Sequence, residues 1–171
     1  IISTLMNTIL QQELKKILNG RFSQSESTRF NYSRGEDTYD PVLSEAVVFP
    51  ETNEEVSKIL KLCNEHKVPV VPFGTGTSLE GNVVGNDKGI TISLEKMNKI
   101  LSVNTQDFDC RVQACVTREQ LNDYLREDGV FFPIDPGANA AIGGMASTSA
   151  SGTMAVKYGT MKTVITGLTV V

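Results

Sequence analysis

Glycine clustering constrains this chain more than any other feature of its sequence. Eleven of the 14 glycines lie in two stretches, residues 74–89 and 137–167. Asp135 is the last acidic residue, so residues 136–171 carry a net charge of +2 and residues 1–135 a net charge of −6. Glycine permits positive φ angles and a close approach of the backbone to a ligand, and missing carboxylates avoid repulsion of an anion. The second stretch in particular indicates backbone that lies against an anionic ligand.

A flexible linker is the alternative interpretation of this second stretch. Apolar side chains are nevertheless spread through it, namely Ile142, Met145, Met154, Val156, Tyr158 and Met161. An ordered loop packs such residues, whereas a linker has no use for them. The pattern therefore favours ordered loops.

Composition excludes several classes of protein. The chain has 171 residues, of which 40% are hydrophobic and 21% charged, which is typical of a soluble domain large enough to bury a core. A net charge of −4 argues against nucleic acid or an anionic membrane as the main partner. Three cysteines and one histidine argue against a disulfide scaffold and a zinc site, so we expect no metal.

The apolar pattern predicts strands interrupted by a few helices, which is typical of an α+β or α/β fold. Two helices begin at capping boxes, Thr52 with Glu55 and Thr117 with Gln120. Residues 2–19 are expected to form a further helix, with Leu5, Ile9, Leu14 and Leu18 near one face. Residues 21–45 are expected to form an extended polar connection. Strands are expected at residues 46–49, 68–72, 90–94, 100–103, 111–116, 130–133 and 164–171.

The first glycine-rich loop follows an apolar strand, where phosphate-binding loops commonly lie. It is not a Rossmann motif, because Leu79 stands where the third glycine belongs, and not a P-loop, because Asn82 replaces the lysine. What is left is a set of backbone N–H groups with the hydroxyls of Thr75, Thr77 and Ser78, which suits a pyrophosphate. A long β-hairpin loop is the alternative.

The second stretch is dominated by small residues, so a flat ligand could lie against its main chain. Two separated loops of this kind suit a long ligand with a phosphate at one place and rings at another, such as a dinucleotide. The alternative is tight packing of small side chains against a neighbouring sheet.

Side chains do not supply an evident reaction centre. His66 is the single histidine and is expected to end a helix. Cys63 fits an apolar helix face, while Cys110 and Cys115, five residues apart on a predicted strand, would point to opposite faces. A cofactor that brings its own chemistry fits this chain better.

Five segments of the chain resemble the FAD-linked oxidase family, which has the vanillyl-alcohol-oxidase-type FAD-binding fold. The resemblance is nearest to its D-lactate dehydrogenase and glycolate oxidase branch and extends from about Pro41 onward. The segments that carry it are residues 70–81, 131–140, 142–148, 150–153 and 156–161.

The resemblance implies that FAD is the cofactor and that two groups of residues bind it. Covalent members carry a histidine where this chain has Thr77, so the FAD is expected to be non-covalent. The implied cofactor-binding residues are Pro72, Phe73, Gly74, Thr75, Gly76, Thr77, Ser78, Leu79 and Gly81, followed by Pro136, Gly137, Ala138, Ile142, Gly143, Gly144, Ala146, Ser147, Ala150, Ser151, Gly152, Tyr158 and Gly159.

The resemblance also implies an α+β architecture of two subdomains, with mixed sheets flanked by helices. Residues 1–40 would form an N-terminal helix and connection, and residues 41–171 an FAD-binding domain that is incomplete at its C-terminus. The catalytic residues would lie in a substrate domain beyond Val171.

The implied function is hydride transfer from a small 2-hydroxy acid, of the D-lactate or glycolate type, to FAD. The alternatives are another branch of the same family and a truncated nucleotide-binding module without activity of its own. We expect an electron acceptor that the sequence does not identify, a homodimer or a complex with other oxidase subunits, and a place in the cytoplasm or at the inner membrane surface.

Overall fold

The structure, a computed structural model, describes residues 8–171 and divides them into two compact units. The first unit extends to Lys96 and the second comprises Met97–Val170. Residues 8–40, predicted as a separate N-terminal segment, belong to the same unit as residues 41–96. Leu5 and the start of the first predicted helix lie outside the described residues.

A four-stranded mixed sheet forms the centre of the first unit. Its strands are β1 (Phe22–Ser23), β2 (Ala46–Val48), β3 (Val70–Phe73) and β4 (Ile90–Ser93), in the order β1-β2-β4-β3. The strand β1 is antiparallel to β2, while β2 and β3 both run parallel to β4. The carboxyl ends of β2, β3 and β4 therefore lie at the same edge of the sheet.

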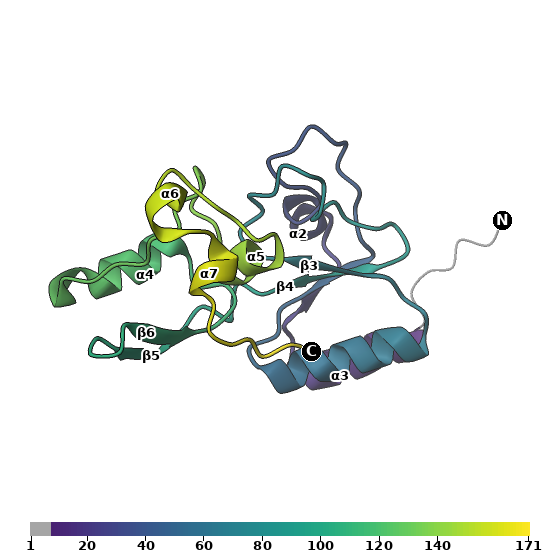
Figure 1. Ribbon diagram of the computed structural model, residues 1–171. Coiled ribbons are helices and arrows are strands. Elements are labelled where there is room, and N and C mark those ends of the chain that lie inside the picture. The colour runs from purple at the N-terminus through teal and green to yellow at the C-terminus, as the bar shows by residue number, and fades with distance from the viewer. Residues whose placement is uncertain (1–7) are drawn as a thin grey trace. The chain divides into compact units, whose positions relative to one another are not determined.

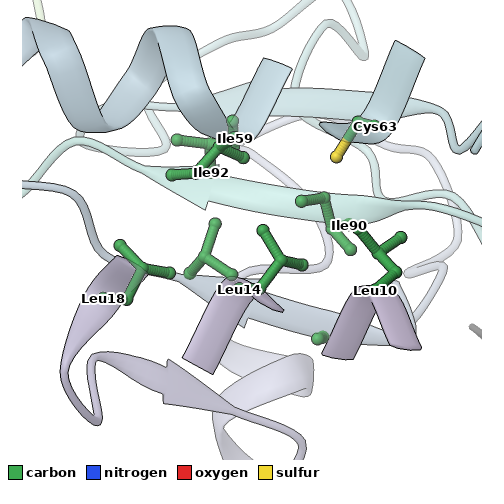
Figure 2. Close-up of a cluster of buried hydrophobic side chains, with 9 residues drawn as sticks. Leu10, Leu14, Leu18, Ile59, Cys63, Ile90 and Ile92 are labelled. Carbon is green, nitrogen blue, oxygen red and sulfur yellow. The ribbon is translucent and has the colours of Figure 1, made fainter. Parts of the chain in front are cut away.

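Two helices, α1 (Thr8–Leu18) and α3 (Asn53–Glu65), cover one face of this sheet and pack against each other. Their buried side chains gather around Ile90 and Ile92 of β4 (Figure 2). The apolar face of α1 consists of Leu10, Leu14 and Leu18, each fully buried, and not of Ile9 as expected, which is 58% exposed. Leucines spaced by four residues share one helix face, and Ile9 lies about 100° from Leu10 and still farther from Leu14 and Leu18 around the helix.

The polar connection is more structured than expected. It contains β1 and the short helix α2 (Glu26–Asn31), which begins at Ser25, whose hydroxyl accepts a hydrogen bond from the Thr28 N–H at 3.3 Å. Figure 1 shows α2 and α3 on opposite sides of β3 and β4. On that second face, Ser44 Oγ and Thr91 Oγ1 are 2.8 Å apart and buried.

The predicted helix start at Thr52 is confirmed, but only one of the two hydrogen bonds of its capping box is present. The Thr52 hydroxyl accepts a hydrogen bond from the Glu55 N–H at 3.2 Å. The Glu55 carboxylate accepts instead from the Glu51 N–H at 2.7 Å and from both terminal nitrogens of Arg21. The hydrogen bond from Arg21 is the main cause of the lowered pKa of Glu55, and it ties the start of α3 to the sheet.

The second unit begins with an antiparallel hairpin of β5 (Ile100–Asn104) and β6 (Asp109–Val112). The helix α4 (Arg118–Leu125) follows, and it starts at Thr117, as expected, with the Thr117 hydroxyl accepting from the Gln120 N–H at 3.2 Å. A 3-10 turn, η1 (Arg126–Asp128), then leads to Gly129 at φ +69°. Leu121 and Leu125 of α4 pack on the hairpin and form a small core together with Val116.

The remaining elements are three short helices, α5 (Ile142–Ser147), α6 (Ala155–Tyr158) and α7 (Met161–Val164). They lie in the stretch expected to be loop, and Met145 and Met161 are buried in a core with Ile134. None of the helices in the part of the chain that the structure describes is long and apolar enough to cross a membrane.

Three strand predictions are wrong or displaced. Residues 130–133 form no strand, because the Phe132 backbone pairs with the side-chain amide of Asn122 in place of a neighbouring strand. The Phe132 N–H donates to Asn122 Oδ1 at 2.7 Å, and the Phe132 carbonyl accepts from Asn122 Nδ2 at 3.2 Å. Residues 164–171 end α7 and continue without a strand partner among the described residues. The strand predicted at 111–116 ends at Val112, so Cys115 lies beyond it and the argument from opposite strand faces does not apply.

We predict that Leu14→Ala lowers the free energy of unfolding by about 2–5 kcal/mol, since it leaves a cavity between α1 and β4. Ile9→Ala on the same helix is the matched control and should change it by less than about 0.5 kcal/mol, because Ile9 is mostly exposed. Denaturant unfolding followed by circular dichroism measures both. Equal losses in the two variants would contradict this account of the core.

Candidate functional site

The first glycine-rich loop begins where β3 ends and leads into β4. Phe73, the last residue of β3, is 6% exposed and lies beneath the loop. Gly76 has φ +75°, and a Cβ atom on it would lie 2.8 Å from Cζ of Phe73. Both the backbone angle and the closeness of the ring require glycine at this position.

The backbone N–H groups of this loop are available for a ligand. Within residues 8–171, no oxygen accepts a hydrogen bond from the N–H groups of residues 74–79. The hydroxyls of Thr75 and Thr77 lie next to each other, with their oxygens 3.3 Å apart. Successive N–H groups with hydroxyls beside them form a site for an anion.

The polar segment before β2 supports this loop. The sequence pattern did not predict this role of the segment. A Cβ atom on Gly35 would lie 2.5 Å from the carbonyl oxygen of Ser78, and one on Gly81 would lie 2.8 Å from the ring of Tyr39. At the far end of the loop, the Gly85 N–H donates to the Ser33 carbonyl at 2.9 Å. The one available signal was Gly35, an isolated glycine in a polar segment, which indicates close backbone contact.

The second stretch contains glycines of two kinds. A Cβ atom on Gly143 would lie 2.8 Å from Cβ of Ala114, and one on Gly152 would lie 2.2 Å from the Asp135 carboxylate, so these two glycines serve packing within the unit. Gly137 and Gly144 have nothing within 4 Å of such an atom. Packing, one of the two alternatives raised by the sequence, therefore applies to Gly143 and Gly152, while Gly137 and Gly144 leave space in which a ligand could approach.

Asp135 holds the segment that follows α5. Its carboxylate accepts hydrogen bonds from the Thr153 hydroxyl and from the Met154 N–H, the latter at 3.1 Å. The hydrogen bond from Thr153, followed by that from Met154, lowers the pKa of Asp135. The last acidic residue of the chain is thus a structural residue that orders the glycine-rich backbone.

The hydroxyls of Ser147, the last residue of α5, and of Thr148, which follows it, donate hydrogen bonds to carbonyls of the helix. Ser147 donates to the Gly143 carbonyl at 2.9 Å, and Thr148 donates to the Gly144 carbonyl at 3.1 Å. Toward a ligand these two side chains present oxygen lone pairs, not the hydroxyl proton.

Tyr158, at the end of α6, lies edge-to-face against Phe131 with ring centroids 5.6 Å apart, and Lys157 Nζ lies 5.0 Å from the centre of its ring. Gly159 follows with φ +83°.

The structure places the predicted cofactor-binding residues in both units. Pro72–Gly81 belong to the first unit, whereas residues 136–159 belong to the second. Ile142, Gly143, Gly144, Ala146 and Ser147 lie on α5, with Ile142 packed into the cores around it. Pro136, Ala138, Ala150 and Gly152 are half-buried, while Ser151 is exposed. His66 ends α3 as expected, and Cys63 is buried in the first core.

We predict opposite effects on stability from two neighbouring substitutions. Gly143→Ala should lower the free energy of unfolding by about 1–3 kcal/mol, since the new methyl group meets Ala114. Gly144→Ala should raise it by up to about 1 kcal/mol, because alanine favours a helix and meets no neighbour there. Thermal and denaturant unfolding without ligand test this pair. Equal changes in both variants would contradict the division into packed and open glycines.

Comparison with known proteins places these features in a family. The model of a family described as FAD binding domain matches residues 44–171. The chain is 46% identical over 149 residues to the probable mitochondrial D-lactate dehydrogenase of Danio rerio, which is 87% of this chain and 30% of that protein. It is 32% identical over 152 residues to the glycolate oxidase subunit GlcD of Bacillus subtilis (strain 168), covering 88% of this chain and 32% of that subunit.

The fold is also that of a solved structure. An alkyldihydroxyacetonephosphate synthase superposes on 95% of this chain and 33% of its own with a TM-score of 0.84, at 21% sequence identity. The chain spans about a third of the length of each of these proteins. The expected α+β architecture and the expected cofactor are thereby confirmed. From residue 44 onward, this chain belongs to the FAD binding domain family.

Proposed function

We propose that this chain is the FAD-holding part of a dehydrogenase that oxidises D-lactate or a close 2-hydroxy acid. The observation that carries this proposal is its 46% identity to a probable D-lactate dehydrogenase over 87% of the chain. Since the chain spans 30% of that relative, the substrate and the reaction are proposed for the whole protein of which these residues are the cofactor-binding part.

The first loop fits the pyrophosphate of FAD. The N–H groups of residues 74–79 have no acceptor within the described chain, and the hydroxyls of Thr75 and Thr77 stand beside them. These donors bind phosphate oxygens without a lysine, and Gly76 lets the backbone approach them. We assign residues Pro72–Gly81, the end of β3 and the first part of the loop, to the pyrophosphate.

Gly137 and Gly144 of the second stretch fit an approach of the cofactor to the main chain. Alanine would fit without contact at either position, and it would favour the helix at position 144. Packing within the unit therefore does not explain these two glycines, whereas a flat ring against the backbone does.

When bound, FAD would supply the redox chemistry, as the acceptor of the hydride that C2 of a hydroxy acid loses on oxidation to the 2-oxo acid. The residues of this chain bind and orient the cofactor. Thr77 offers a hydroxyl and no nucleophilic nitrogen in the first loop, which supports non-covalent binding.

Glycolate is the second candidate substrate, favoured by the 32% identity to the glycolate oxidase subunit GlcD. That relative is a subunit by name, which supports a complex with other oxidase subunits as an alternative to a homodimer. An electron acceptor of unknown identity and a place in the cytoplasm or at the inner membrane surface stay predictions.

Gly76→Val tests the first loop. The side chain would meet Phe73 and occupy the space where the backbone approaches the phosphates, so we predict that the Kd for FAD rises at least about tenfold. Gly20→Val is the matched control: Gly20 has φ +86° and no neighbour within 4 Å, so it carries the same backbone strain of about 1–2 kcal/mol away from the loop. Flavin fluorescence titration of the apoprotein measures both. A normal Kd for Gly76→Val would refute the assignment of this loop.

The substrate is tested on the full-length flavoprotein under anaerobic conditions. We expect D-lactate to bleach the visible flavin band, and L-lactate to leave it unchanged. Bleaching by glycolate but not by D-lactate would favour the second candidate. If no 2-hydroxy acid reduces the flavin, the proposed reaction is wrong.

A further inference from the structure

One side chain contacts the residues that lie at or beyond the carboxyl ends of three parallel strands. Tyr32, which follows α2, lies edge-to-face against Phe49, the residue after β2, with ring centroids 5.5 Å apart and planes at 76°. It lies in the same manner against Phe73, the last residue of β3, at 5.0 Å and 71°. Its hydroxyl donates a hydrogen bond to the carboxylate of Glu95, two residues after β4.

Phe73 connects this arrangement to the first loop. A Cβ atom on Gly76 would lie 2.8 Å from Cζ of Phe73, so the ring of Phe73 is in close contact with the loop backbone. The contacts thus form a continuous series, from the Glu95 carboxylate to the Tyr32 ring, to the Phe73 ring, and then to Gly76. We therefore expect a change in the tilt of the Tyr32 ring to shift Phe73 and, through Phe73, the backbone that carries the free N–H groups.

The far end of the loop contacts Ser33, the residue that follows Tyr32. The Ser33 carbonyl accepts hydrogen bonds from the N–H groups of Gly85, at 2.9 Å, and of Val42, at 3.4 Å. Residues 32 and 33 therefore contact the loop near both of its ends. The loop has no helix of its own, so its shape depends on these outside contacts.

From this geometry we propose that Tyr32 is a positioning residue for the FAD pyrophosphate, with its hydroxyl bond to Glu95 setting the angle of the ring under the loop. The inference rests on the proposed assignment of the first loop to the pyrophosphate. Edge-to-face contact is directional, since the positive ring edge meets the negative ring face, so the hydrogen bond at the end of the ring determines how Phe73 is held.

The test compares variants of the full-length protein. Tyr32→Phe keeps both ring contacts and removes the hydrogen bond, and Tyr32→Leu removes both. Glu95→Ala removes the acceptor, whereas Glu95→Gln retains an oxygen that accepts from the hydroxyl. Tyr124→Phe is the control, because Tyr124 is 57% exposed on α4 of the second unit.

Three properties are measured for each variant: the Kd for FAD, the melting temperature of the apoprotein, and the phosphorus NMR resonances of bound FAD. We expect the Kd to rise about threefold in Tyr32→Phe and in Glu95→Ala, and at least about tenfold in Tyr32→Leu. The phosphorus resonances should move in all three. Tyr124→Phe should match the wild type, and Glu95→Gln should lie between the wild type and Glu95→Ala, because a neutral amide oxygen accepts a weaker hydrogen bond than a carboxylate. The Tyr32→Phe, Glu95→Ala double variant should equal the single variants, since both remove the same bond.

The outcomes separate this inference from the assignment on which it rests. If Gly76→Val weakens FAD binding but Tyr32→Phe, Glu95→Ala and Tyr32→Leu keep the wild-type Kd and phosphorus resonances, the role of Tyr32 is refuted. A lower melting temperature with unchanged resonances would likewise show a merely structural residue. If Gly76→Val also leaves the Kd unchanged, the loop assignment itself is wrong. Should Tyr32→Leu fail to fold, Tyr32→Phe and Glu95→Ala still decide.

Discussion

Burial of α1 and α3 against one face of the β2–β4 pair is the constraint on which the rest of the first unit depends. Leu14, Ile59 and Ile90 meet in this core, and each is fully buried. Apolar burial of this kind is the dominant favourable term in folding. Because β2, β3 and β4 run parallel in this sheet, their carboxyl ends lie at one edge. Ligands of open sheets with parallel strands bind beyond such an edge, and the first glycine-rich loop starts there.

The start of the first loop, residues 74–79, is held by its neighbours and not by hydrogen bonds from its own N–H groups. Within residues 8–171 these six N–H groups have no acceptor, so this part of the loop needs support from outside. Phe73 contacts it from below, and Gly35 and Tyr39 approach it from the segment before β2. A segment with the composition of a plain surface connection therefore supports the loop that we assign to the FAD pyrophosphate. The physical reason is that a backbone that binds an anion with its own donors cannot use the same donors to hold itself.

The second glycine-rich stretch serves packing at some positions and is open to a ligand at others. Positions 143 and 152 require glycine because Ala114 and Asp135 lie against them, whereas Gly137 and Gly144 face open space. Hydrogen bonds to the Asp135 carboxylate order the segment and explain why one acid remains just before it. Membership of the FAD binding domain family fits both roles, since a flat cofactor needs a surface that is ordered and bare.

The sequence by itself determined the local features and the cofactor. The cap at Thr52, the helix end at His66 and the strand of Ile90 were predictable, because they depend on hydrogen bonds and apolar spacing within a few residues. The tertiary structure alone decided what distant residues do. Phe132 pairs with the side chain of Asn122 and not with a strand, and Tyr32 lies under the loop it supports. Whether a segment forms a strand depends on a partner strand, and whether a position requires glycine depends on the residues packed against it. Both are distant in sequence, so the local pattern does not contain them.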